Sequence, residues 1–503
     1  MKKPRSFEGP SSLEGHPIHL VAKGQSLGYS RAFWLAYASN FLISVAVSVL
    51  YRYADFVRLL GGTEYQLGWI VGVGMIGSLS ARLALGSGID RRGPKLVWLL
   101  SLIGFCLICF AHLGLSRPDT PAIYLLRIAY CLAVAGIFGA TMAFVSSRMP
   151  VEQMAEMIGM LGTAGFMGMV VGAQVGDWLC GAAELTRADV DRLFVAAGLI
   201  GLSAIIFAVL ATGQARPRAI RHRQPPIGYL LWRYQPGPIL LVALIAGAAL
   251  GWPSTFLATY AADLSIPRIG TFFTLYSLTA VLTRVLTRRW PQQFGLPSLV
   301  LAGLAILAAS QFFFLLVQNE GTLILPGLTY GIGHAILFPS LVAAGCRTFP
   351  NRHRGLGTML IMSAFDLGTM VGSPLLGAII HHAPTLGLPS YPTLFVLMGV
   401  VLAGTALFYC LVVASGHQDT PNHGKVSRAQ KPNPMPLAGS SLGQTSGART
   451  LQLAHLHPSH NPEISSKISP LETQAQRNDL AKPHPPAQTS GKLSTKHPLP
   501  QAG

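Results

Sequence analysis

Long apolar segments alternate with short polar connections from about residue 32 to about residue 414. A helix needs about 20 mostly apolar residues to cross the hydrocarbon core of a bilayer, and it pairs all of its backbone polar groups internally. The segments of this length predict an all-α membrane protein with twelve transmembrane helices. The predicted spans are about 32–51, 65–86, 96–115, 121–147, 157–180, 191–212, 237–260, 268–287, 297–317, 322–346, 356–381 and 391–414.

The pattern repeats along the chain at an interval of about 200 residues. Parallel repeats of this kind are typical of transporters built from two similar halves. We therefore predict two pseudo-symmetric six-helix bundles, at 31–212 and 237–415. The matched pairs include Tyr130 with Tyr330, Phe138 with Phe338, Gly168 with Gly368 and Gly172 with Gly372, and, at a spacing two residues longer, Gly68 with Gly270 and Arg82 with Arg284.

Three segments outside the bundles are polar. Residues 1–30 have no apolar core like that of a cleaved signal peptide, so we expect the first span to direct membrane insertion. The linker at 213–236 is rich in Arg and Pro. The segment 416–503 is rich in Pro, Ser, Gln, Lys and His and has few aromatic residues. Such a composition cannot bury enough apolar surface to fold alone, and we expect a disordered tail.

Composition and charge agree with a membrane protein. Hydrophobic residues make up 50% of the chain and charged residues 11%, against roughly 25% charged in soluble domains. The net charge of +18 would suggest nucleic-acid binding in a soluble protein. If both termini are cytoplasmic, however, the connections on that side carry roughly three times as many Lys and Arg residues as those on the other side. This asymmetry predicts a multi-pass inner-membrane protein with cytoplasmic termini, whose basic charge meets the lipid bilayer and not nucleic acid.

The sequence gives no indication of catalysis or of a cofactor. The six cysteines lie in or at the ends of spans, without the paired spacing of a metal site, and we expect them to pack as small apolar residues. There is no Gly-rich loop followed by Lys and Ser or Thr, so ATP-driven transport is not expected. Histidines in the last segment, His455 among them, leave weak metal binding there as an alternative.

A dense cluster of charges lies between the second and third predicted spans. It has the spacing Gly-x-x-x-Asp-Arg-x-Gly-x-Lys, with its motif residues at Gly86, Asp90, Arg91, Gly93 and Lys95. The pattern predicts a cytoplasmic turn in which glycines let two helix ends approach and the Asp accepts from helix N-terminal amides. The motif resembles the signature loop of the major facilitator superfamily, secondary transporters that include arabinose-efflux proteins and drug exporters.

The resemblance implies two bundles that rock about a central site lined by spans 1, 4, 7 and 10. On those spans it places Asn40, Tyr130, Trp252, Tyr330 and His334 at a shared substrate pocket. For the aromatic residues, packing or anchoring at the membrane interface is the alternative, and for His334 a structural hydrogen bond. It also makes Arg82 and Arg284, near the cytoplasmic ends of spans 2 and 8, candidates for gate or anchor residues.

Two ionisable residues within spans are functional candidates, because a charge is costly there. Asp366, near the middle of span 11, is a candidate for the group that gains and loses a proton during transport; a hydrogen-bonded structural Asp is the alternative. Arg127, in span 4, either tunes a nearby carboxylate, contacts substrate, or extends to the outer interface. Its surroundings resemble a span-4 motif of proton-coupled exporters, although Cys131 stands at the Gly position of that motif.

Small residues recur in spans 5 and 11 at a spacing that lets two helix backbones approach closely. They include Gly168 and Gly172 in span 5, and Gly368 and Gly372 in span 11. Span 5 also resembles a motif of exporters, but Ala173 follows Gly172 where that motif has Pro. The resemblance therefore favours export over import.

The sequence thus predicts a monomeric secondary transporter that moves a small organic molecule by alternating access, with protons as coupling ion and export as direction. Few fixed charges in the spans argue against a highly charged substrate, while Arg127 leaves an organic anion open. An importer or facilitator of the same fold is one alternative. A non-transporting membrane sensor or scaffold that acts through the C-terminal tail is another.

Overall fold

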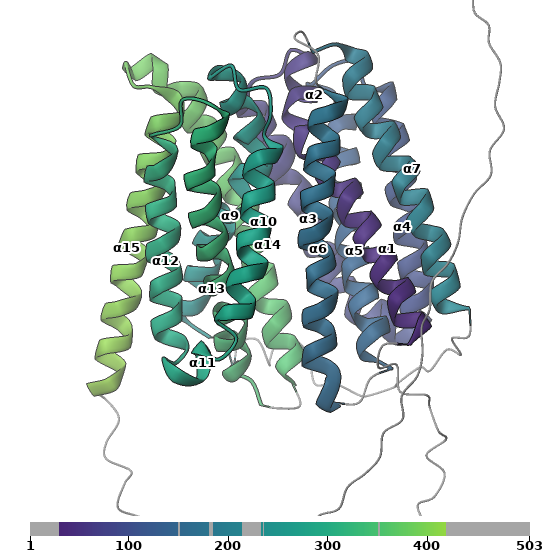
Figure 1. The fold of residues 1–503 in the computed structure, drawn as a ribbon, viewed down its shortest axis with the longest axis vertical. Helices are drawn as coiled ribbons and strands as arrows, with labels where there is room; N and C mark the ends of the chain where they lie inside the picture. Colours follow the sequence, from purple (N-terminus) through teal and green to yellow (C-terminus); the bar gives the residue numbers. More distant parts are fainter. Residues whose placement is uncertain are drawn as a thin grey trace, which may run out of the picture. The chain divides into compact units, whose positions relative to one another are not determined.

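A computed structural model describes residues 30–148, 151–180, 185–213, 233–234, 236–350 and 353–418. Side chains are not described at 85–92, 151–156, 158 and 414–418. Most of the predicted N-terminal tail, linker and C-terminal tail therefore lies outside the described residues. The described part is helical throughout, apart from short turns, and forms one unit with two halves (Figure 1).

Within the part of the chain that the structure describes, each half carries six long helices together with short helical segments. The N half contains α1 (Arg31–Val49), η1 (Leu50–Arg52), α2 (Tyr53–Leu59), α3 (Glu64–Arg92), α4 (Pro94–Ala111), η2 (His112–Gly114), α5 (Pro121–Ser146), α6 (Val151–Leu179) and α7 (Arg187–Thr212). The C half contains α9 (Pro238–Asp263), α10 (Gly270–Leu286), α11 (Trp290–Gln293), α12 (Leu296–Phe314), η3 (Glu320–Leu323), α13 (Ile324–Arg347), α14 (Arg354–His382), η5 (Ala383–Leu386) and α15 (Ser390–Gln418).

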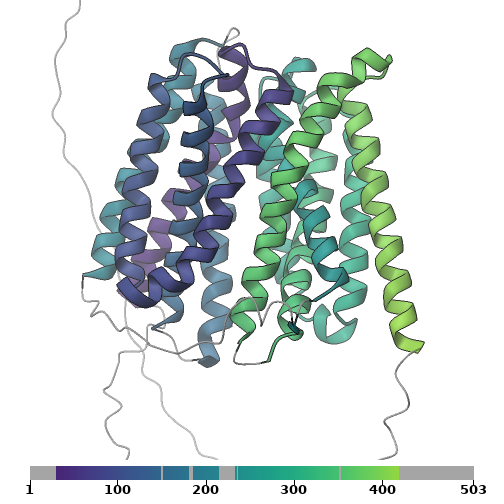
Figure 2. The ribbon, with the colours of Figure 1, turned by 180° about the vertical axis from the view of Figure 1, so that it is seen from behind.

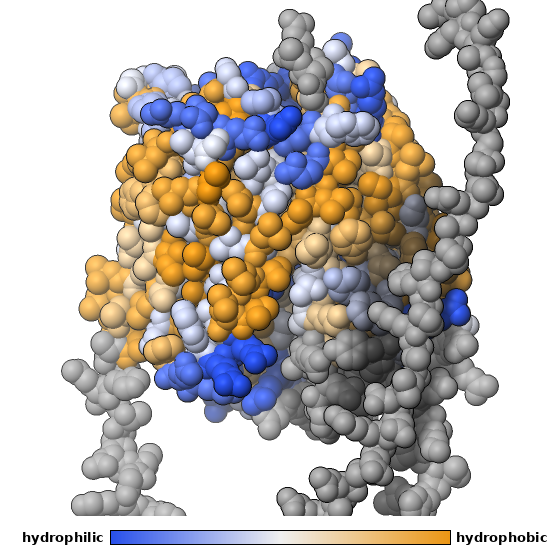
Figure 3. Space-filling view, viewed as in Figure 1, coloured by the Kyte–Doolittle hydropathy of each residue, from blue (hydrophilic) through white to orange (hydrophobic). Residues whose placement is uncertain are grey.

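The long helices have the length and composition of membrane spans. Within the described residues, 11 are long and apolar enough to cross a bilayer, and Gly270–Leu286 is a shorter apolar helix of 17 residues. Together they confirm the twelve predicted spans. Hydrophobic side chains form a band between two polar rims on the outside of the unit (Figure 3). We call the rim where α1 begins and α15 ends the terminal face, and the other rim the opposite face (bottom and top of Figure 1).

The two halves repeat the same packing. In the N half, α1 packs on α6 and α7, and α3 on α5; in the C half, α9 packs on α14 and α15, and α10 on α13. The register repeats as well. Gly168 faces Ser44 of α1, and Gly368 faces Leu244 of α9, so both partners are offset by 200 residues. This confirms the predicted pseudo-symmetry of the two bundles.

The charged motif between α3 and α4 differs from the predicted turn. The helix α3 continues through Gly86, Asp90 and Arg91 to its end at Arg92, and only Gly93 leaves the helical conformation, with φ at 79°. Charged residues accept helical geometry readily, whereas a positive φ is easy only for Gly, and Pro94 then starts the next helix. Further along, the Lys95 ammonium lies 3.5 Å from the carbonyl oxygen of Thr212, at the end of α7.

Candidate functional site

The two halves meet near the opposite face through a buried cluster of charges, which we call the latch: Arg52, Asp55 and Asp177. The Arg52 guanidinium donates to Asp177 at 2.6 Å and 3.0 Å and to Asp55 at 3.2 Å, all within the N half. It also donates to the carbonyl oxygen of Pro267 in the C half. Asp177 accepts from the backbone N–H of Gly270, at the start of α10, at 2.6 Å. Charge-assisted bonds of this kind are strong ones.

Sequence reasoning missed the latch. The sequence pattern singled out neither Arg52 nor Asp177 as a candidate, yet both are buried, with exposed fractions of 8% and 5%. The first span does not end before Arg52, because the chain continues through η1 into α2 as far as Leu59. A signal was available: the residues after Arg52 remain mostly apolar up to Leu60.

Glycines bring α3 and α14 together on the same side of the molecule. A Cβ at Gly68 would overlap the Ser373 carbonyl, and one at Gly72 would lie within 2.7 Å of Pro374. A Cβ at Gly377 would meet the Glu64 carbonyl. The ribbons of α3 and α14 accordingly run close together toward the opposite face and draw apart toward the terminal face (Figure 2).

Asp366, the candidate proton site on α14, lies across the interface from two side chains of α3. Its carboxylate accepts from Ser78 at 2.6 Å and from the Arg82 guanidinium at 2.5 Å and 3.1 Å. Ser78 and Arg82 are four residues apart on α3, so they share one face of that helix. The side chain of Asp366 is 14% exposed and that of Arg82 is 26% exposed. The structure thus brings together two predicted site residues from different halves.

Arg284, the repeat partner of Arg82, has a different neighbour. Its guanidinium carbon lies 4.6 Å from the centroid of the Phe166 ring on α6, so this contact also joins the two halves. Its Nε is buried without a hydrogen-bond partner in the described part of the chain, and Arg284 forms none of the ion pairs found there. Arg284 therefore makes a cation–π contact, whereas its repeat partner Arg82 forms an ion pair with Asp366.

His334 lies next to this contact. Its Nδ1 is 2.5 Å from the Tyr276 hydroxyl, and its ring is 6.0 Å from that of Phe166 and 5.3 Å from that of Phe338. Tyr330, one turn earlier on α13, is fully buried and donates to the Ala249 carbonyl. His334 therefore belongs to the interface of the halves, whereas Tyr330 packs inside the C half.

The remaining predicted pocket residues are spread over separate places. Asn40 is buried and donates to the Leu161 carbonyl of α6 at 3.3 Å. Trp252 is 1% exposed, with its ring 4.7 Å from that of Phe314 and 5.2 Å from that of Phe395, inside the C half. The structure does not place these two with His334.

Arg127 lies between aromatic rings of the N half. Its guanidinium carbon is 4.4 Å from the centroid of Tyr53 and 4.9 Å from that of Tyr130. It is half-buried, and its Nε has no hydrogen-bond partner among the described residues. Since a helical side chain leans toward the start of its helix, the group extends from α5 toward the opposite face.

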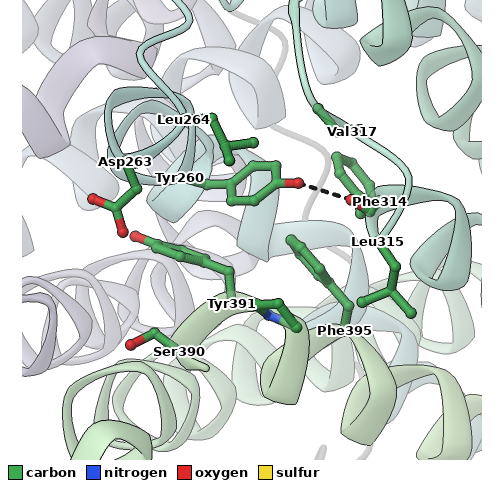
Figure 4. A pocket seen from close by; sticks show the side chains of 10 residues that line it. Tyr260, Asp263, Leu264, Phe314, Leu315, Val317, Ser390, Tyr391 and Phe395 are labelled. Carbon is green, nitrogen blue, oxygen red and sulfur yellow. Dashed lines mark hydrogen bonds between the residues drawn. The ribbon is translucent and has the colours of Figure 1, made fainter. Parts of the chain in front are cut away.

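A separate cavity of about 370 Å³ opens inside the C half (Figure 4). Tyr260 and Asp263 of α9 line it together with Tyr391 of α15. The Tyr260 hydroxyl donates to the Phe314 carbonyl at 2.7 Å, and the Tyr391 hydroxyl donates to Thr259 at 2.6 Å. None of the predicted site residues lines this cavity. Among the described residues no group of His, Cys, Asp and Glu has a metal-binding arrangement.

Comparisons with known proteins agree with this architecture. The profile of the Major Facilitator Superfamily matches residues 32–263 and 239–455. The chain is 21% identical to the Staphylopine export protein of Staphylococcus aureus over 64% of this chain and 82% of that protein. It is 23% identical to the Gallate transporter of Pseudomonas putida over 71% of this chain and 85% of that protein.

Solved structures resemble the fold. The nucleoside transporter NupG has a TM-score of 0.60 at 13% identity, covering 76% of this chain and 98% of that one. A bacterial homologue of the human lysosomal transporter Spinster, in an inward-facing and occupied conformation, has a TM-score of 0.58 at 15% identity, covering 78% and 98%. The repeated halves and the match of the family profile to both of them lead to one conclusion: the chain is a membrane-embedded transporter of small molecules that belongs to the Major Facilitator Superfamily.

Proposed function

We propose that the protein is a proton-coupled exporter that works by alternating access, with the terminal face in the cytoplasm of a bacterial inner membrane. The contacts near the opposite face support an inward-open state. Arg52 reaches the C half at Pro267, Gly270 donates to Asp177, and the Gln174 amide donates to Thr274 at 3.0 Å. Breaking these contacts would open the opposite face in the other half of the cycle.

The observation that carries the coupling proposal is the ion pair between Arg82 and Asp366. It joins the two halves, and it lies closer to the terminal face than the glycine contacts of α3 and α14. Protonation of Asp366 would remove the charge that holds Arg82 and weaken this contact. Deprotonation would restore it. A proton could therefore shift the balance between the two states of the transporter.

Asp366→Asn tests the coupling. The full-length protein is reconstituted in liposomes, and proton movement after a pH jump is recorded with a panel of small organic solutes. We expect solute-dependent proton flux in the wild type and at least a tenfold loss in Asp366→Asn. Asp191→Asn is the matched control, because Asp191 pairs with Arg187 at 2.8 Å with both side chains 35% exposed. Solute flux that is indifferent to the proton gradient and to Asp366 would leave a facilitator or another coupling ion.

Export is the direction we propose, because one relative is named an export protein and two others, each 28% identical over 23% of this chain, are named chloramphenicol efflux pumps of Mycobacterium tuberculosis. We expect inside-out vesicles to take up the solute at a higher rate than right-side-out vesicles. The reverse ratio would make the protein an importer, the second candidate.

A sensor or scaffold role would depend on residues 417–503, whereas transport by a monomer requires only the two bundles. We expect the chain truncated after residue 416 to keep most of its flux and to elute as a monomer. Loss of all function in a truncated protein that is still inserted and folded would favour the scaffold.

A further inference from the structure

The two halves carry different charges at equivalent positions of their interface. The offset of 202 residues relates Arg82 on α3 to Arg284 on α10, and the offset of 200 relates Phe166 on α6 to Asp366 on α14. The second register is fixed by the matched packing of Gly168 and Gly368, two residues further along the same helices. Arg82 meets Asp366, and Arg284 meets Phe166. One pair of mates is an ion pair, and the other is a cation that has no counter-charge within the described part of the chain.

Ser78, the second hydrogen-bond partner of Asp366, has no polar equivalent near Arg284 either. Ser78, which donates to Asp366, corresponds to Ala280. The position around Arg284 therefore lacks both the acid and the hydroxyl of its mate. A guanidinium without a counter-charge in the membrane is costly, and aromatic contact offsets only part of that cost. A charge left unpaired in this way is suited to a ligand that brings the opposite charge.

The surroundings of Arg284 describe the rest of such a ligand. Phe166 and Tyr276 are each 7% exposed, and their rings lie 6.3 Å apart in an edge-to-face arrangement. The hydroxyl of Tyr276 and the imidazole of His334 form a polar pair at 2.5 Å beside them. The place thus offers one cation, flat apolar walls and two neutral hydrogen-bonding groups.

We propose that Arg284 is the anchor of the substrate, and that the substrate is a small organic carboxylate with a flat or apolar body. Its carboxylate pairs with the Arg284 guanidinium, and its body lies against Phe166 and Tyr276. The inference rests on the proposed transport function, whose substrate class it specifies. Because Phe166 belongs to the N half and the other two to the C half, a bound anion contacts both bundles.

Phe166→Asp is the sharpest test, because it restores at this position the acid that the repeat has at Asp366. The new carboxylate would pair with Arg284 and displace a ligand anion. Phe166→Asn is the matched control, since Asn has the size of Asp and also removes the ring, but carries no charge. Arg284→Gln removes the cation, and Arg284→Lys keeps it.

Thermal unfolding of the purified full-length protein is measured with carboxylates and their neutral counterparts: gallate with methyl gallate, benzoate with benzamide, and tartrate with its diamide. We expect at least one carboxylate to raise the melting temperature, while its neutral counterpart does not. Its affinity should fall at least tenfold in Phe166→Asp and in Arg284→Gln, and by a clearly smaller factor in Phe166→Asn, which loses only the ring contact, and in Arg284→Lys, which keeps the charge. Melting without ligand shows that each variant is folded.

Three results would overturn the proposal: stabilisation by none of the carboxylates, equal stabilisation by the neutral compounds, or equal losses in Phe166→Asp and Phe166→Asn. Transport is scored separately in liposomes. A carboxylate that binds with the expected pattern but is not moved would contradict the transport function and leave the site standing. Movement of neutral or cationic solutes without carboxylate binding would contradict the site and leave the transport function standing.

Discussion

At the scale of single residues, three arginines at the interface of the halves have three different kinds of partner. Arg52 is paired with two carboxylates in the latch and Arg82 with Asp366, whereas Arg284 faces an aromatic ring and has no ion pair among the residues that the structure describes. In each case the cost of removing charge from water decides what the residue must find. We expect the buried acid–base pairs to hold a conformation, and Arg284 to bind a ligand anion.

The latch should hold the opposite face closed. Asp177→Asn removes the charge that binds Arg52 and, through Gly270, the C half. Breaking a buried ion pair costs about 3–5 kcal/mol, and the remaining bond to Asp55 reduces that loss here. We expect a lower melting temperature and more frequent opening. Asp191→Asn, at a half-exposed pair, should cost about 1 kcal/mol or less.

Cys180 reports the opening. It follows the end of α6, and burial raises the pKa of its thiol to about 12, so the reactive thiolate is scarce at pH 8. Labelling of Cys180 by a maleimide, followed by peptide mass spectrometry, should be slow in the wild type and clearly faster in Asp177→Asn. Equal labelling rates in the two proteins would mean that the latch does not control this face.

At the scale of helices, close approach depends on where glycine stands within a helix. On α6, a Cβ at Gly168 would lie 2.9 Å from the carbonyl oxygen of Phe41 and 2.9 Å from the amide nitrogen of Val45, both backbone atoms of α1. On the same helix, a Cβ at Gly162 would meet nothing within 4 Å. The small-residue pattern of span 5 therefore contains both packing positions and free positions, which sequence alone does not separate.

Alanine substitution should distinguish the two kinds of glycine. Gly168→Ala forces α1 and α6 apart, and we expect a loss of about 1–3 kcal/mol in stability. Gly162→Ala should be neutral or slightly stabilising, because alanine favours the helix by up to about 1 kcal/mol. Unfolding in mixed micelles, followed by circular dichroism, measures both. A similar loss in both variants would show that helix–helix distance is not the cause.

At the scale of the whole molecule, the halves are joined firmly near the opposite face. Gln174 of α6 and Thr274 of α10 touch there at 3.0 Å. With both replaced by Cys in a background without the native cysteines, a short bis-methanethiosulfonate should link the two thiols and stop transport, and a reductant should restore it. Each single Cys variant serves as control. Full transport by the cross-linked protein would exclude separation of the halves at this face.

The spans could be predicted from sequence because the bilayer fixes their length and apolar character. The boundary errors came from helices that continue past that limit, as α3 does through Asp90. The side-chain contacts between the two halves could not be predicted in this way. Asp366 was recognisable as a costly charge, but its contact with Arg82 joins residues that are far apart in sequence. Arg52 was missed although the apolar residues after it gave a local signal, because two of its partners, Asp177 on α6 and Pro267 in the C half, are far from it in the sequence.

Phe166 and Asp366 stand at equivalent positions of the two halves but differ in charge. Because the chain is duplicated, each position in one half can be compared with its counterpart in the other half, without any other sequence. Where both halves keep the same residue, as at Gly168 and Gly368, the shared scaffold accounts for it. Where an acid faces one arginine and a phenylalanine faces the equivalent arginine, as at Asp366 and Phe166, the difference indicates a function that the two halves do not share.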